Sequence, residues 1–154
     1  MSAPVMGIDP GQSGAVALLL PDQKPLIWTF AGMTLHDMWI VIGGCASYDG
    51  VEAYIEDVHS MPKQGVSSSF KFGRHYGNLE AFLTAHQIPF DRVQPSVWQR
   101  SFSLTRKSKD ETLTAKKNRH KALAQEFWPK AAGHITHATA DALLIAEYGR
   151  RLRG

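Results

Sequence analysis

Three acidic residues stand where the sequence pattern places the end of a strand or the start of a helix. Asp9 closes the apolar segment 5–9, and Glu56 stands near the end of a second strand-like segment, residues 51–57. Asp141 lies in the first turns of an amphipathic C-terminal segment. A carboxylate at the end of a buried strand is costly unless a partner compensates its charge, and a hard divalent cation is such a partner. The three carboxylates are therefore candidate metal ligands.

The same acids have ordinary structural uses. An Asp before Pro10 and Gly11 is common in turns. Glu56 could be an exposed strand residue, and Asp141 could be an exposed acid at a helix start. Chemistry is favoured if the strands that carry Asp9 and Glu56 are neighbours, because two buried like charges must then share a proton or bind a cation. The sequence thus predicts that the acids converge at one end of a sheet.

A histidine accompanies the last acid. His137 and Asp141 are four residues apart and would share one face of a helix. Three carboxylates and a histidine suit phosphodiester hydrolysis with two Mg²⁺ or Mn²⁺ ions, in which one ion polarises the attacking water and the other stabilises the leaving 3′ oxygen. His137 could bind a metal or act as a general acid or base. The plain alternative is a helix-capping histidine.

The segments that must position these residues begin with strands and continue with strands and helices in alternation. We expect strands at residues 5–9, 15–20, 26–30, 51–57 and 87–93, and helices at 34–46, 70–86, 115–127 and 137–151, with a small helix after Pro95 that contains Trp98. This order predicts an α/β fold with a five-stranded mixed sheet flanked by helices. The sheet would combine a three-stranded antiparallel meander with two parallel strands. We expect one domain over residues 1–154.

Composition limits the class of protein. No apolar run is long enough for a membrane span, and the N-terminus lacks the pattern of a secretory signal. The only cysteine, Cys45, lies in an apolar neighbourhood and is read as a core residue. These features favour the cytoplasm. The formal net charge is only +3, but eight Lys and Arg residues fall between Arg100 and Lys121, which suits phosphate binding as well as a solvated helix face.

Five short motifs together resemble the RuvC-type Holliday-junction resolvases, most closely the short versions carried by bacteriophages. The motifs are Gly7-Ile8-Asp9-Pro10-Gly11, Ile55-Glu56, Phe72-Gly73-Arg74-x-Tyr76-Gly77-x-Leu79-Glu80, Gln94-Pro95-x-x-Trp98-Gln99 and Ala140-Asp141-Ala142-Leu143-Leu144-Ile145-Ala146. The resemblance implies a ribonuclease H-like fold and a homodimer that cuts a four-way junction with paired symmetric nicks, using Mg²⁺ or Mn²⁺, in DNA recombination and repair. It assigns the acid cluster to Asp9, Glu56 and Asp141.

One position departs from the family pattern. Many members have a further Asp three residues before the last acid, and here that place is Ala138. We assign the fourth position to His137, with His134 as the alternative. The glycine turn after Asp9 is also similar to the start of sugar kinases and actin-like ATPases. Those folds need about twice this length, so no nucleotide cofactor is expected.

Two polar stretches are candidates for DNA contacts. The first, which the resemblance places beside the junction centre, contains Lys63, Gln64, Ser67, Ser68, Ser69, Phe70, Lys71 and Arg74. The second contains Lys107, Lys109, Lys116, Lys117 and Arg119. Hydroxyls, amides and cations suit phosphate contacts, and Phe70 could stack on an unpaired base or pack in the core. Trp98 is read as a core residue.

Other functions remain open from the sequence. The same fold and metals could serve a broader nuclease that cuts flaps or forks, or a protein that binds junctions without cutting them. The intact Asp9, Glu56 and Asp141 argue against loss of catalysis. An RNA substrate is a further alternative.

Overall fold

Five short strands form one mixed sheet in the computed structural model, which describes residues 3–59 and 63–154. The strands are β1 (Val5–Asp9), β2 (Ala15–Leu19), β3 (Leu26–Thr29), β4 (Glu52–Glu56) and β5 (Phe90–Val93). Their order across the sheet is β3-β2-β1-β4-β5. The pairs β1–β2 and β2–β3 are antiparallel, and β1–β4 and β4–β5 are parallel. The predicted meander with two parallel strands is confirmed.

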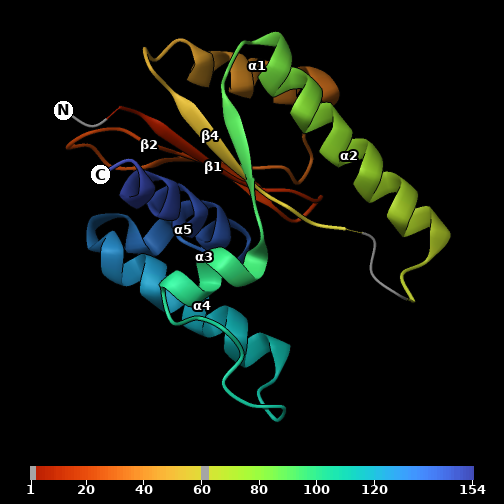
Figure 1. The fold of residues 1–154 in the computed structure, drawn as a ribbon, viewed down its shortest axis with the longest axis vertical. Coiled ribbons are helices and arrows are strands. Elements are labelled where there is room, and N and C mark those ends of the chain that lie inside the picture. The colour runs from red at the N-terminus through yellow and green to blue at the C-terminus, as the bar shows by residue number, and fades with distance from the viewer. Residues whose placement is uncertain (1–2, 60–62) are drawn as a thin grey trace.

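Helices cover both faces of the sheet. They are α1 (Leu35–Ala46), α2 (Val66–Ala85), α3 (Pro95–Ser101), α4 (Leu113–Phe127) and α5 (His137–Leu152), with a 3₁₀ helix at Pro129–His134. Figure 1 shows α1 and α2 on one side of the strands, and α5 on the other with α3 and α4 beside it. Among residues 3–59 and 63–154, none of these helices combines the length and apolar character that crossing a bilayer requires.

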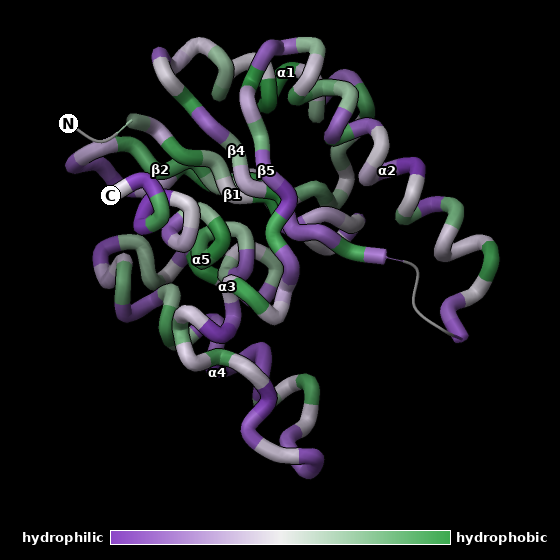
Figure 2. Tube along the Cα trace, in the orientation of Figure 1, coloured by the Kyte–Doolittle hydropathy of each residue, from purple (hydrophilic) through white to green (hydrophobic). Residues whose placement is uncertain are grey.

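The sheet separates two hydrophobic cores. One contains Met6, Ile8 and Ile55 with side chains of α1 and α2, and the other contains Val5 and Tyr54 with side chains of α5. Successive strand residues point to opposite faces, so β1 and β4 each contribute apolar side chains to both cores. Figure 2 shows the apolar segments gathered around the strands and α5. Trp98 and Cys45 are buried, as predicted.

Helix α5 lies directly on β1 because Gly7 has no side chain. A Cβ atom at Gly7 would overlap the carbonyl oxygen of Ala142 and the backbone nitrogen of Ala146. Thr136 and Thr139 form a capping box that fixes where α5 begins. The close approach at Gly7 sets the distance between α5 and the sheet. Its contact residue Ala142 is the neighbour of Asp141 in the sequence.

Some boundaries differ from the prediction. Helix α2 begins at Val66 rather than at residue 70, so Ser67, Ser68 and Ser69 lie in a helix and not in a loop before it. Serine is a weak helix former because its hydroxyl competes for backbone groups, but the first turn of a helix tolerates it. The other part of the predicted loop, residues 60–62, lies outside the described residues. Helix α4 begins two residues earlier than predicted, and a 3₁₀ helix at Pro129–His134, which was not predicted, precedes Ile135.

Candidate active site

The three acids come from the ends of two neighbouring strands and from the second turn of a helix. β1 and β4 run parallel, with Ile8 opposite Ile55, so the next residues, Asp9 and Glu56, lie at the same edge of the sheet. Asp141 reaches this edge from α5, which lies on β1. Sites at the carboxyl ends of parallel strands are common in sheets of this kind.

Electrostatic interactions connect the acids with one another. The pKa of Asp9 is raised well above its ordinary value, first by burial and then by the charges of Glu56 and Asp141. Burial also raises the pKa of Glu56, to about 7, and the charge of Asp141 acts in the same direction. Asp9 therefore lies in the field of both other acids and Glu56 in the field of Asp141, and the ionised forms of Asp9 and Glu56 are disfavoured unless positive charge is supplied.

Two ring nitrogens hold two of these carboxylates in place. The indole Nε1 of Trp98, on α3, donates a hydrogen bond of 2.7 Å to Oε2 of Glu56. The imidazole Nδ1 of His120, on α4, lies 2.8 Å from Oδ1 of Asp141. The two rings contact each other edge to face, with their centroids 5.5 Å apart. The carboxylates are thus supported from the side opposite the sheet by two helices that follow β5.

Sequence reasoning missed His120. His137 lies one helical turn before Asp141 on α5 and is exposed, and its Nε2 lies 2.7 Å from Oδ1 of Asn118 on α4. His134 is exposed in the 3₁₀ helix and lines a groove with Leu26 of the edge strand β3. The available signal for His120 was its spacing, because it precedes Ala124 by four residues and so shares the buried face of an otherwise basic helix.

The donor set fits a divalent cation. Carboxylate oxygens are the ligands that Mg²⁺ and Mn²⁺ prefer, and Asp9 and Glu56 are buried acids whose charge calls for compensation. In residues 3–59 and 63–154, no group of three or more His, Cys, Asp or Glu side chains is placed so that it could hold a metal ion. An ion here would bind to Asp9, Glu56 and Asp141.

The first predicted DNA-contact stretch lies along the start of α2. Figure 1 shows this end of the helix extending away from the sheet. Phe70 is 70% exposed, so it is not a core residue. Lys71 and Arg74 line a groove with Gln12 of the β1–β2 turn. Lys63, Ser67 and Ser68 are also exposed, and Gln64 and Ser69 are half-buried.

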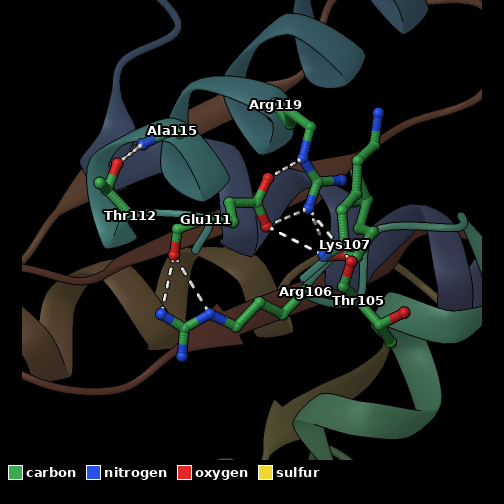
Figure 3. Close-up of polar contacts among 8 residues, drawn as sticks. Thr105, Arg106, Lys107, Glu111, Thr112, Ala115 and Arg119 are labelled. Carbon is green, nitrogen blue, oxygen red and sulfur yellow. Dashed lines mark hydrogen bonds and ion pairs between the residues drawn. The ribbon is translucent and has the colours of Figure 1, made fainter. Parts of the chain in front are cut away.

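The second stretch divides into a structural part and an exposed part. Arg119 binds both carboxylate oxygens of Glu111, at 2.7 and 2.8 Å, and also the carbonyl oxygen of Thr105 (Figure 3). Arg106 donates a hydrogen bond to the backbone carbonyl of Glu111, and the backbone nitrogen of Lys107 donates one to the carboxylate of Glu111. Arg119 therefore holds the loop that precedes α4 against that helix. Lys107 and Lys109 are exposed on this loop.

Two lysines at the start of α4 lie close enough to act on the acids. The charge of Lys117 lowers the pKa of Asp9, and the charge of Lys116 lowers that of Glu56, although burial has the larger effect on both. Positive charge beside a carboxylate cluster suits a phosphate that must approach negatively charged side chains. Of the five cations in the second stretch, Lys116 and Lys117 are therefore the ones connected with the acid site.

Comparison with known proteins identifies the fold. No protein-family model matches the sequence, and no curated protein matches it. The structure of Thermus thermophilus RuvC is similar over 97% of this chain and 95% of that chain, with a TM-score of 0.64 and 14% identity. T. thermophilus RuvC in complex with a Holliday junction substrate is similar over 98% and 95%, with a TM-score of 0.67 and 14% identity. The chain has the ribonuclease H-like fold of these RuvC structures.

Proposed function

We propose that this chain is a metal-dependent endonuclease that resolves four-way DNA junctions. The observation that carries the proposal is that Asp9 and Glu56 end neighbouring parallel strands, with their pKa values raised by burial and by the charge of Asp141. The likeness in fold to RuvC bound to a Holliday junction supports the choice of substrate. The sequence motifs add support for a short, phage-like member of that group, acting in the cytoplasm.

In this proposal, the protein's carboxylates would bind the cation, and a hydrogen bond from Trp98 would orient one of them. The carboxylates of Asp9, Glu56 and Asp141 supply hard oxygen ligands. The Trp98 N–H stabilises the ionised form of Glu56, which is the form that can bind a cation. Bound divalent ions would activate a water molecule and stabilise the leaving oxygen in phosphodiester hydrolysis. Two ions per site are part of the proposal.

The remaining groups would bind the DNA. Lys116 and Lys117 would hold the phosphate backbone next to the acids, and the exposed Phe70 would contact bases at the junction centre. Each chain carries one acid cluster, so two nicks in the two symmetry-related strands of a junction require two copies of the chain. We therefore propose a homodimer with two-fold symmetry, which matches the symmetry of a four-way junction.

Cleavage of a synthetic four-way junction tests the proposal. The wild-type protein should cut in Mg²⁺ or Mn²⁺ and leave paired nicks at symmetric positions in two strands of like polarity. Asp9→Asn should bind the junction with near wild-type affinity and cut it more slowly by orders of magnitude, because a metal-binding carboxylate is lost. Glu126→Gln, an exposed substitution on α4, serves as the control that should cut normally.

The substrate panel separates the proposal from its rivals. Faster cutting of flaps or forks than of junctions would favour a broader branched-DNA nuclease, and cutting of RNA duplexes would favour an RNA-processing enzyme. Tight junction binding by the wild type without cleavage in either metal would favour a binding protein. Each of these results would contradict the proposed function.

A further inference from the structure

His120 is a buried histidine on a helix whose other surface is basic. His120 is 4% exposed, and its Nδ1 atom lies 2.8 Å from Oδ1 of Asp141. Because an ionised carboxylate only accepts hydrogen bonds, this contact pairs an ionised Asp141 with the tautomer of His120 that carries its hydrogen atom on Nδ1. This bond fixes the tautomer of the ring and restrains one oxygen of Asp141. The second oxygen of Asp141 stays available for another interaction.

The imidazole is itself held in position. Its ring meets the ring of Trp98 edge to face, at 72° between planes, and the N–H of Trp98 binds Glu56. Burial on all sides restricts the rotamers of both rings. The orientations of Glu56 and Asp141 are therefore coupled through a contact between α3 and α4, and not only through the sheet.

The Nε2 atom of His120 points to a functional reason for this residue. Within residues 3–59 and 63–154, Nε2 is buried and has no hydrogen-bond partner. A buried polar atom without a partner lowers the stability of the folded protein. Leucine or phenylalanine would fill the same space without this cost. A histidine at this place is thus poorly explained by packing and well explained by the bond from Nδ1 to Asp141.

We propose that His120 is the positioning residue of the acid site and holds Asp141 through the Nδ1–H bond in the orientation that binds a divalent cation. This inference rests on the proposed function. It assigns the histidine of the site to α4 and not to His137, which is exposed and bonded to Asn118. Metal-ligating carboxylates depend on such outer hydrogen bonds, and their loss lowers metal affinity or activity by about 10- to 100-fold.

Three substitutions separate the bond from the bulk of the ring. The amide nitrogen of asparagine occupies nearly the place of Nδ1 in histidine, whereas the amide nitrogen of glutamine lies near the place of Nε2. His120→Asn therefore retains a donor to Asp141, and His120→Gln and His120→Ala do not. His36→Asn, at an exposed position of α1, is the matched control. Mn²⁺ affinity without DNA is measured by titration calorimetry and by electron paramagnetic resonance, beside junction cleavage and thermal unfolding.

The expected result is a split between metal affinity and stability. His120→Asn should bind Mn²⁺ within a few-fold of the wild type, and His120→Gln and His120→Ala should bind it about 10- to 100-fold more weakly. A merely structural role would instead lower Mn²⁺ affinity in proportion to the loss of thermal stability in all three variants.

Two other outcomes overturn the inference. If His120→Asn loses as much Mn²⁺ affinity as His120→Ala, the bond from Nδ1 is not what matters. If His137→Asn weakens Mn²⁺ binding and the His120 variants do not, the histidine has been assigned to the wrong helix. In either of these outcomes, the proposed function stands as long as the wild-type protein binds Mn²⁺ and cuts junctions. A wild-type protein that neither binds Mn²⁺ nor cuts junctions would contradict both the proposed function and this inference.

Discussion

The indole nitrogen of Trp98 donates a 2.7 Å hydrogen bond to Glu56, and both side chains are buried at the carboxyl end of β4. Burial raises the pKa of Glu56 to about 7, and the bond from Trp98 is the largest of the influences that lower it. A residue predicted as ordinary core therefore also controls the charge of a candidate metal ligand. Pro95, at the first turn of α3, places Trp98 immediately beyond the end of β5.

Replacing Trp98 by phenylalanine should weaken metal binding without unfolding the protein. Trp98→Phe keeps an aromatic ring in the core but removes the N–H donor, so the pKa of Glu56 should rise further and the proton should compete better with the cation. We expect Mn²⁺ affinity at pH 7 to fall by about 10-fold or more, and its pH dependence to move to higher pH. Titrations from pH 6 to 9 measure both.

The control for this substitution is Trp39→Phe on α1, where the tryptophan is 39% exposed and packs against His86. It should leave Mn²⁺ affinity and its pH dependence unchanged. Equal pH dependence in Trp98→Phe and the wild type would show that the indole N–H does not control the charge of Glu56.

The stability of the metal-free protein should fall as pH rises. Below about pH 4.5 Glu56 carries a proton in both the folded and unfolded states, so it has no effect on the free energy of unfolding. Between about pH 4.5 and 7 the unfolded state releases this proton first, and above pH 7 the loss is complete. The total is about 3 kcal/mol. Burial raises the pKa of Asp9 too, so Asp9 acts in the same direction.

Glu56→Gln should remove this contribution. Urea unfolding with a chelator present, at pH values from 4.5 to 8.5, should show a shallower fall in the free energy of unfolding for Glu56→Gln than for the wild type. The exposed control Glu126→Gln should keep the slope of the wild type. A Glu56→Gln protein that is less stable than the wild type at pH 8 would contradict the assignment of Glu56 as a destabilising buried acid.

Gly7 should not tolerate a larger side chain. A Cβ atom there would overlap the backbone of α5 at Ala142 and Ala146, and backbone cannot move aside as a flexible side chain can. Gly7→Ala should lower the free energy of unfolding by about 1–3 kcal/mol and displace Asp141 from the acids of the sheet. Chemical denaturation and Mn²⁺ titration measure the two effects.

Gly44→Ala is the matched comparison for Gly7. Gly44 is exposed in α1, and a Cβ atom there would meet nothing within 4 Å. Alanine is a better helix former than glycine, so this variant should be more stable by about 0.5–1 kcal/mol. Equal effects at the two positions would mean that α5 does not depend on the missing side chain of Gly7.

Lys117 and Arg119 should have different roles although they are two residues apart. Lys117→Ala should weaken junction binding and reduce the dependence of log affinity on log salt by about one unit, as expected for one lost phosphate contact. Arg119→Ala should instead free the loop before α4, because Arg119 donates hydrogen bonds to both carboxylate oxygens of Glu111 and to the carbonyl oxygen of Thr105. Limited proteolysis between residues 105 and 111 measures that change. Equal salt dependence and equal proteolysis in the two variants would contradict the assignment of DNA binding to Lys117 and of loop anchoring to Arg119.

The sequence was sufficient for the sheet and its acids because their signals are local. Val5 to Asp9 and Ala15 to Leu19 are short apolar runs separated by a glycine turn, and the capping box at Thr34 marks the start of α1 as predicted. Asp9 and Glu56 end neighbouring parallel strands, which is the condition on which the prediction of a shared site depended.

What the sequence left open depends on packing between distant segments. His120 lies 21 residues before Asp141, and their contact exists only because α4 packs beside α5. His137 and Asp141 share a face of α5, as their spacing predicted, but His137 is exposed and bonds to Asn118 on α4. Local periodicity places residues on a helix face but does not tell which neighbour covers that face.

A crystal structure of the wild-type protein with Mn²⁺, with anomalous scattering recorded to locate the ion, tests the central claim most directly. The account predicts Mn²⁺ bonded to carboxylate oxygens of Asp9, Glu56 and Asp141, with Trp98 and His120 still bonded to the second and third of these acids. Manganese bound only elsewhere, with the three carboxyl groups too far apart to share an ion, would contradict it.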